Sequence, residues 1–333
     1  MQILDMNGME IMGIYSCLPQ KNEDNFKRCK EVYGDEKKAL SIVKATGIRS
    51  RRIVNAGTSS LDLCIAAAER LLMDLQEEKD EIGAIVDVTF TPERTMPCNA
   101  CQAQRRLGLS TDLIAFDINL ACSGWAYGLF VSGQIAKATG KKVLLLDGDT
   151  QTPYMDASDI ATVPVMADAG TATLVSPESA NGKSFWKFAF LTNGTKGDAL
   201  TLPPGGKISM DGLGIFKFVT MDVLYFIRDF MAQVGETPEI INAFVPHQAN
   251  VFMIQQIAKK LKFPMEKLWL SGDVFGNSSS ATVPTTIAYC GGKETDCIDR
   301  RLLVSGFGGG LSASVGLIDL SKDCALKVLD YEV

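Results

Sequence analysis

The chain has a single histidine, His247, among its 333 residues, so any imidazole chemistry must involve that residue. It also lacks a long apolar run: no stretch reaches the roughly eighteen residues of a membrane-spanning helix. The first segment carries acidic residues where a signal peptide would carry positive charge. We therefore predict a cytoplasmic protein without a membrane span.

An excess of basic residues is missing too. The net charge is −6, and there is no basic stripe that could displace counterions from duplex nucleic acid. Nine cysteines, an odd number without a repeating spacing, indicate free thiols in a reducing compartment. We expect no nucleic-acid partner.

What the sequence does contain is an alternation of short apolar runs and longer helical segments, which predicts an α/β fold. The runs at 83–90, 112–119 and 141–149 predict strands buried on both faces. After a polar stretch the alternation resumes with a similar order of elements. We therefore predict two duplicated α/β halves, residues 1–178 and 179–333.

Cys122 follows one of these strands and opens a segment that is apolar on almost all sides, which predicts an internal helix. A helix amino terminus presents unpaired N–H groups and the positive end of the helix dipole. A cysteine there is expected to have a lowered thiol pKa and to act as a nucleophilic thiolate. The alternative is a small buried residue that only fills space.

Two further polar residues stand just before predicted helices, and the first of them lies at a strand-to-helix junction, where the active sites of α/β proteins collect. His247 ends an apolar strand and precedes a helix. It could be a catalytic group, or it could be a residue that only makes structural hydrogen bonds. Asn277 lies in GNSSSATVP (276–284). It could donate its amide into a pocket, or it or a neighbouring serine could cap the following helix.

The run FGGG (307–310) lies between two predicted strands. Successive glycines let the backbone approach a ligand and offer N–H groups to an oxyanion. The surrounding residues match neither the dinucleotide pattern nor the P-loop pattern. Cys98 and Cys101 form a C-x-x-C pair without a second pair or a spare histidine, so we expect no metal site and no cofactor.

In this order, ACSGWAYGL, VPHQAN, GNSSSATVP and FGGG resemble β-ketoacyl-acyl-carrier-protein synthase III of the thiolase superfamily. The resemblance covers nearly the whole chain, including TGIRSRRIV (46–54) and MADAGTATLV (166–175). It implies a homodimer with a thiolase-like five-layered α-β-α-β-α fold made of two similar halves.

The resemblance also implies a reaction. Cys122 would take an acyl group from a thioester, and a malonyl unit on an acyl carrier protein would then lose CO₂ and condense with it. His247 and Asn277 would donate hydrogen bonds to the enolate oxygen. The backbone N–H groups of Cys122 and Gly309 would hold the tetrahedral intermediate, and Phe307 would line the pocket.

The chain departs from the family where relatives hold coenzyme A. Ser41, Ala45 and Ile160 stand where a tryptophan and arginines are expected, which puts the usual clamp in doubt. Met96 stands where an aromatic side chain shapes the far end of the partner subunit's acyl pocket, and a flexible methionine there indicates a different, longer acyl group.

The cationic patch that relatives present to an acidic carrier protein is partly kept. Lys217, Lys259 and Lys260 remain, whereas Phe252 replaces an expected arginine. Alternatively, Lys259 and Lys260 could be ordinary surface lysines whose charge is solvated and binds no partner. With the coenzyme A clamp altered and these lysines present, we predict an acyl-carrier-protein partner.

Three other functions remain as alternatives. A non-condensing acyltransferase would pass the Cys122-bound acyl group to an alcohol or amine. A non-catalytic partner subunit would only bind an acyl carrier, which the intact Cys, His and Asn argue against. A papain-like protease would share these three residue types but not the duplicated α/β pattern.

Overall fold

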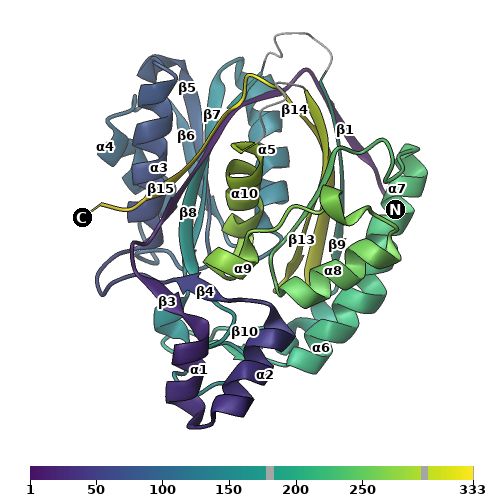
Figure 1. Cartoon of the computed structure of the whole chain (residues 1–333). Helices are drawn as coiled ribbons and strands as arrows, with labels where there is room; N and C mark the ends of the chain where they lie inside the picture. Colours follow the sequence, from purple (N-terminus) through teal and green to yellow (C-terminus); the bar gives the residue numbers. More distant parts are fainter. Residues whose placement is uncertain (178–183, 294–298, 333) are drawn as a thin grey trace.

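The computed structural model describes residues 1–177, 184–293 and 299–332, and within these ranges most strands form two mixed sheets (Figure 1). The six-stranded sheet has the order β15 (Ala325–Asp330), β2 (Glu10–Leu18), β8 (Asp168–Ser176), β7 (Lys142–Thr150), β5 (Ile82–Val88), β6 (Ile114–Ile118). The five-stranded sheet has the order β1 (Leu4–Asn7), β9 (Phe185–Thr192), β14 (Ser312–Leu320), β13 (Arg300–Gly308), β12 (Ala243–Pro246). Two small antiparallel pairs join β3 (Asn22–Asp24) to β4 (Ser50–Arg52) and β10 (Leu200–Thr201) to β11 (Ser209–Met210).

Helices separate and cover the two sheets. Their bounds are α1 (Asn25–Tyr33), α2 (Glu36–Thr46), α3 (Ser60–Asp74), α4 (Asn99–Leu107), α5 (Gly124–Thr139), α6 (Gly212–Lys217), α7 (Leu224–Val234), α8 (Val251–Lys260), α9 (Gly272–Phe275), α10 (Thr282–Thr286). One π-helical segment, Phe218–Val223, joins α6 to α7, and another, Ile287–Gly291, continues α10.

The helices occupy three layers. Helices α5 and α10 contact strands of both sheets and lie between them, whereas α3 and α4 cover the outer face of the six-stranded sheet. On the other side, α7 and α8 pack on the five-stranded sheet through one apolar cluster (Figure 1). The layer order α-β-α-β-α confirms the predicted thiolase-like fold.

The composition of each helix fits its layer. Helix α3 has one buried apolar face and is capped by Ser59, whose side chain accepts a hydrogen bond from the backbone of Asp62 in a reciprocal capping box. Helix α5 buries residues all round, including Trp125 and Leu129, because a sheet lies on each side of it. The glycines Gly124 and Gly128 let α5 approach Val88 of β5, since a Cβ at either position would lie within 3 Å of that side chain.

The two ends of the chain exchange sheets. Strand β1 pairs with β9 in the five-stranded sheet, and β15 pairs with β2 in the six-stranded sheet. The chain otherwise passes from one sheet to the other between β8 and β9, where residues 178–183 lie outside the described ranges. The division into residues 1–178 and 179–333 stays a prediction.

One expectation about the strands was wrong. The run at 112–119 forms β6, which is not buried on both faces: its side chains are half-buried or exposed, and Ile114 is 45% exposed. The reason is its position, because β6 is the last strand of its sheet and pairs with β5 on one side. The apolar sequence alone cannot distinguish such an edge strand from a central one.

In the described residues, no helix has the length and apolar character needed to cross a membrane.

Candidate active site

Cys122 lies in the turn between β6 and α5, two residues before the helix begins at Gly124. Strand β13 passes directly against it. A Cβ on Gly308 would lie 2.8 Å from the Cys122 Cβ and 3.0 Å from its Sγ, and a Cβ on Gly306 would lie 2.7 Å from the Cys122 carbonyl oxygen. Glycine is therefore required at these positions so that the end of β13 can lie beside the thiol.

A cavity of about 590 Å³ opens over this cysteine. Five residues that the sequence singled out line it although they lie far apart along the chain; they are Cys122, His247, Asn277, Phe307 and Gly309. Most of the remaining lining is apolar, which is typical of a pocket for a hydrocarbon chain with a few convergent polar groups.

The thiol of Cys122 differs from expectation. Burial raises its pKa to about 12, and a hydrogen bond from Ser279 only partly opposes that effect. The prediction that the helix terminus lowers this pKa was therefore wrong. Desolvation of this half-buried sulfur outweighs the partial charge of a helix that begins two residues later. The thiol is protonated at neutral pH and needs a base when it attacks.

His247 is buried, and this burial lowers its pKa to about 3, so the imidazole is neutral at neutral pH. Its Nδ1 lies 2.7 Å from the Thr282 Oγ1, and its ring packs edge-on against Phe307 at 5.4 Å between ring centroids. A neutral imidazole can donate from one nitrogen and accept at the other. The side chain thus has a structural hydrogen bond and still contributes to the cavity wall.

Asn277 stabilises the turn before a helix and also faces the cavity, the two roles between which the sequence did not decide. Its Oδ1 accepts a hydrogen bond from the Ser279 backbone N–H at 2.9 Å, which stabilises the turn before α10. Its Nδ2 is only 3.5 Å from the Ala249 carbonyl, a long contact that leaves donor capacity at the cavity. The Asn277 backbone is fixed by hydrogen bonds with Val165 and Ala167.

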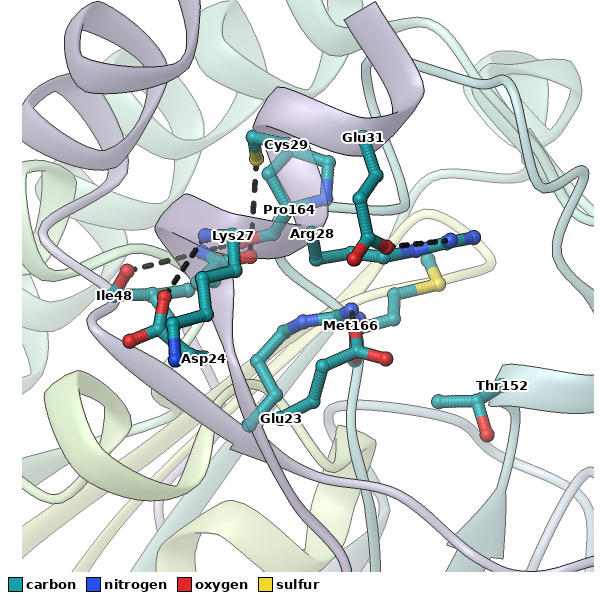
Figure 2. Close-up of polar contacts among 12 residues, drawn as sticks. Glu23, Asp24, Lys27, Arg28, Cys29, Glu31, Ile48, Thr152, Pro164 and Met166 are labelled. Atoms are coloured by element: carbon teal, nitrogen blue, oxygen red, sulfur yellow. Dashed lines mark hydrogen bonds and ion pairs between the residues drawn. The ribbon is translucent and has the colours of Figure 1, made fainter. Parts of the chain in front are cut away.

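The loop that holds Asn277 rests on a buried arginine that sequence reasoning missed. Arg51 is fully buried; it donates to the Met166 carbonyl at 2.6 Å and forms an ion pair with Glu23. Met166 in turn forms a β-bridge with Asn277. Figure 2 shows Glu23 and Met166 close together in this region. Arg51 lies in TGIRSRRIV, whose basic pair was the available signal.

Ser279 and Thr282 were also missed, although both lie in GNSSSATVP. Ser279 has a φ of +59°, a rare conformation for a residue other than glycine, and its Oγ lies 3.8 Å from the Cys122 Sγ. Thr282 contacts His247 as described above. The sequence identified a serine near Asn277 only as a candidate cap and did not single out Thr282, and only the fold shows that the two side chains reach the thiol and the imidazole.

The remaining sequence-derived candidates lie around or away from the cavity. Ala45 and Ile160 line it, together with other apolar residues, whereas Ser41 is exposed on α2. Met96 is 85% exposed and does not line this cavity. The three basic candidates are all exposed on α6 and α8; they are Lys217, Lys259 and Lys260.

The described part of the chain has no group of three or more His, Cys, Asp or Glu side chains placed to hold a metal ion. Cys98 is half-buried and Cys101 is exposed, at the start of α4.

Comparison with known proteins gives a consistent result. Residues 116–194 match the family model of 3-oxoacyl-[acyl-carrier-protein] synthase III, and residues 231–320 match the model of its C-terminal part. A β-ketoacyl-[acyl-carrier-protein] synthase III of Caldanaerobacter subterraneus is 32% identical, with 94% of this chain and 98% of the relative covered. The enzyme of the same name from Clostridium acetobutylicum is 31% identical, with 92% and 97% covered.

Solved structures agree with the sequence relatives. The crystal structure of a 3-oxoacyl-(acyl-carrier protein) synthase from Burkholderia xenovorans superposes with a TM-score of 0.92 at 30% identity and covers 99% of both chains. That agreement extends over both sheets and the helices between them. The chain therefore belongs to the β-ketoacyl-acyl-carrier-protein synthase III family, the condensing enzymes of the thiolase superfamily.

Proposed function

We propose that the chain condenses an acyl group carried by Cys122 with a malonyl unit bound to an acyl carrier protein. The observation that carries this proposal is the single cavity shared by a thiol, a neutral imidazole, a carboxamide and the glycine turn. These groups meet the needs of the reaction: a nucleophile for a thioester, donors for an enolate and backbone N–H groups for a tetrahedral oxyanion.

The reaction has two stages. First, the Cys122 sulfur attacks the thioester carbonyl, the C–S bond to the donor breaks and the donor leaves as a thiol. Second, the C–C bond to the malonyl carboxylate breaks, CO₂ leaves and its electron pair forms an enolate. The enolate carbon then attacks the acyl group and expels the Cys122 thiolate, which gives a β-ketoacyl product.

Neutral donors suit the second stage. Asn277 and His247 can donate hydrogen bonds to the enolate oxygen, whereas a carboxylate would repel its charge. The Thr282 hydroxyl has one hydrogen. When it is donated to the His247 Nδ1, the Nε2 carries a hydrogen that can be donated into the cavity. When it is donated instead to the Ser279 carbonyl, 2.8 Å away, the Nε2 becomes an acceptor.

The direct test uses the wild-type protein. We expect intact-mass spectrometry to show an acyl adduct after incubation with an acyl thioester, followed by release of labelled CO₂ when malonyl-carrier protein is added. Discharge of the acyl-enzyme by an alcohol or amine, without CO₂ release, would instead support the non-condensing acyltransferase.

The proposed donor and acceptor carrier is an acidic acyl carrier protein. Support comes from the three exposed lysines of α6 and α8 on a chain whose net charge is −6, and from the apolar Ala45 and Ile160 at the cavity. Complementary charge mainly speeds encounter and orients the partner.

We expect Cys122 to be acylated faster from the carrier protein than from coenzyme A bearing the same acyl group. Replacing both Lys259 and Lys260 with glutamate should lower the carrier-dependent rate about tenfold, a difference of about 1.4 kcal/mol, and leave the coenzyme A rate unchanged. Lys137→Glu, an exposed lysine in the last turn of α5, is the matched control. A tenfold preference for coenzyme A would contradict the assignment.

We further propose that the enzyme is a homodimer in which Met96 borders the acyl site of the partner subunit. Its 85% exposure in the isolated chain and the exposed edge strand β6 are consistent with contact surfaces that a second copy covers.

Met96→Trp should then shorten the longest acyl chain that Cys122 accepts, because a rigid indole would fill the end of the site. Acylation rates with straight-chain thioesters of increasing length would measure this. Met73→Trp, at an exposed methionine of α3, is the control. Equal chain-length profiles for Met96→Trp and wild type would refute the position of Met96 at the acyl site.

A further inference from the structure

The loop that carries Asn277 is paired with a second loop, residues 165–167, in a parallel β-bridge. The Asn277 N–H donates to the Val165 carbonyl at 2.9 Å, and the Ala167 N–H donates to the Asn277 carbonyl at 2.7 Å. Met166, the residue paired with Asn277, lines the same cavity. Paired residues of neighbouring extended segments point to the same face, so this register directs the Asn277 side chain into the cavity.

The register of this bridge decides where the carboxamide points. Successive side chains of an extended chain point to opposite faces. A slip of one residue would therefore turn Asn277 away from the cavity and put Gly276 or Ser278 in its place. The bridge is isolated and belongs to neither large sheet, so contacts other than a strand ladder must hold its register.

Gln151 joins the two sides of this bridge. It directly follows β7, lines the cavity and is 2% exposed. Its Nε2 donates to the Ala167 carbonyl at 3.0 Å and to the Asn277 carbonyl at 2.5 Å. A carboxamide nitrogen has two hydrogens, so both are used, one on each loop.

Packing does not explain a glutamine at this position. A carboxamide loses its hydrogen bonds to water when it is buried, and this cost must be offset by partners in the protein. An apolar side chain of the same length would fill the space and leave the two carbonyls with fewer donors. The feature that distinguishes Gln151 from such a side chain is its pair of hydrogen bonds across the bridge.

The turn that holds Gln151 is fixed in its turn by β8. The next residue, Thr152, donates to the Asp168 carboxylate through its hydroxyl and through its N–H, the latter at 2.9 Å. Asp168 begins β8 and directly follows Ala167. The end of β7 is thus tied to the chain that forms one side of the bridge, and Gln151 extends this connection to Asn277.

Arg51 and Gly276 complete the support of the bridge. Arg51 donates to the Met166 carbonyl, so the carbonyls of Met166, Ala167 and Asn277 each accept a hydrogen bond from a buried side chain. Gly276 has a φ of +82°, and a Cβ there would lie 2.7 Å from the Ala167 Cβ and 3.1 Å from the Arg51 Cγ. Glycine therefore lets the loop lie against both residues.

We propose that Gln151 is a positioning residue for decarboxylation, which holds the Asn277 carboxamide where the enolate oxygen forms. Gln151 acts through Asn277 and not by contact with the substrate. A donor stabilises an enolate only when its direction is fixed in advance, and misplacement by about 1 Å can lower a rate by about 10²-fold. This inference rests on the proposed function, in which Asn277 stabilises the enolate.

The test replaces Gln151 with methionine, which has a similar length but no N–H group to donate. We expect the release of labelled CO₂ from malonyl-carrier protein to fall about 10-fold to 10²-fold. Acylation of Cys122 should stay nearly unchanged. The loss should appear in kcat and not in the KM for malonyl-carrier protein, because the enolate exists only after the substrate has bound.

Gln104→Met is the matched control. Gln104 lies on α4, outside the cavity, and its Nε2 also donates to a backbone carbonyl, that of Leu109 at 2.6 Å. Its replacement removes a similar hydrogen bond and should change neither acylation nor CO₂ release. A second variant, Gln151→Asn, keeps the carboxamide but is one methylene shorter and cannot reach both carbonyls, so its CO₂ release should also fall.

A double-mutant cycle separates positioning from a general structural role. In an Asn277→Ala background, Gln151→Met should cause no further loss of CO₂ release, because the residue through which it acts is gone. The same loss in both backgrounds, or wild-type CO₂ release in folded Gln151→Met and Gln151→Asn, would overturn the proposal. Absence of CO₂ release in the wild type, or full release in Asn277→Ala, would instead refute the proposed function, so the two failures are distinguishable.

Discussion

Replacing Cys122 with alanine should abolish the acyl adduct and lower product formation by about 10⁴–10⁶-fold, the range seen when a catalytic nucleophile is removed. The physical reason is that, among the cysteines that the structure describes, Cys122 is the one that lines the cavity with the imidazole, the carboxamide and the glycine turn. Intact-mass spectrometry after incubation with an acyl thioester measures the adduct, and product analysis measures the reaction.

The other eight of the nine cysteines remain in this variant, so they provide an internal check. Cys101 is the exposed thiol among the cysteines of the described ranges and is therefore open to adventitious acylation, which makes Cys101→Ala the matched control. That control should retain the full adduct. An adduct that survives in Cys122→Ala would move the nucleophile elsewhere.

The second large effect concerns decarboxylation. Asn277→Ala should leave acylation of Cys122 nearly intact but lower CO₂ release by about 10²–10³-fold, the usual result of deleting one preorganised oxyanion donor. His247→Ala should have the same effect on CO₂ release. The measurement is single-turnover acylation followed by labelled CO₂ release from malonyl-carrier protein.

Because Asn277 also stabilises the turn at Ser279, its replacement needs a variant that preserves this contact. Asn277→Asp keeps the Oδ1 acceptor and adds a negative charge that opposes the enolate, so CO₂ release should fall at least as far as in Asn277→Ala. Undiminished CO₂ release in Asn277→Asp would show that the carboxamide does not stabilise the enolate.

The ionisation of His247 fits the second stage of the reaction. Burial lowers its pKa to about 3, so the imidazole is neutral through the physiological range. A neutral imidazole can donate a hydrogen bond to the enolate oxygen from one ring nitrogen while the other nitrogen is hydrogen-bonded to Thr282.

The fold class and the family could be predicted from the sequence. The alternation of apolar runs and helical segments predicted an α/β fold, and the order of the motifs around Cys122, His247, Asn277 and FGGG predicted the family and the layered architecture. These signals are local: periodicity, caps and glycine runs occur within ten or so residues, where sequence patterns are most informative.

Other features required the tertiary structure. The apolar run at 112–119 reads like a central strand, yet β6 is at a sheet edge, because strand order is set by long-range pairing. Strand β1 pairs with β9 and strand β15 pairs with β2, so each pairing joins residues more than 160 positions apart in the sequence. No local sequence pattern predicts such a pairing. The glycines beside Cys122 were recognised for their N–H groups, but the structure adds a steric reason at Gly308.

The sequence by itself determined which residue types this protein brings to its chemistry: one thiol before an internal helix, one imidazole, one carboxamide and a glycine turn. It could not determine their ionisation, because a pKa depends on the solvent and charges that the whole fold excludes or collects around a group. The helix after Cys122 suggested a lowered thiol pKa, whereas burial raises it to about 12. Only the tertiary structure decided which groups surround that thiol, since Ser279 and Gly308 approach Cys122 through space and not along the chain.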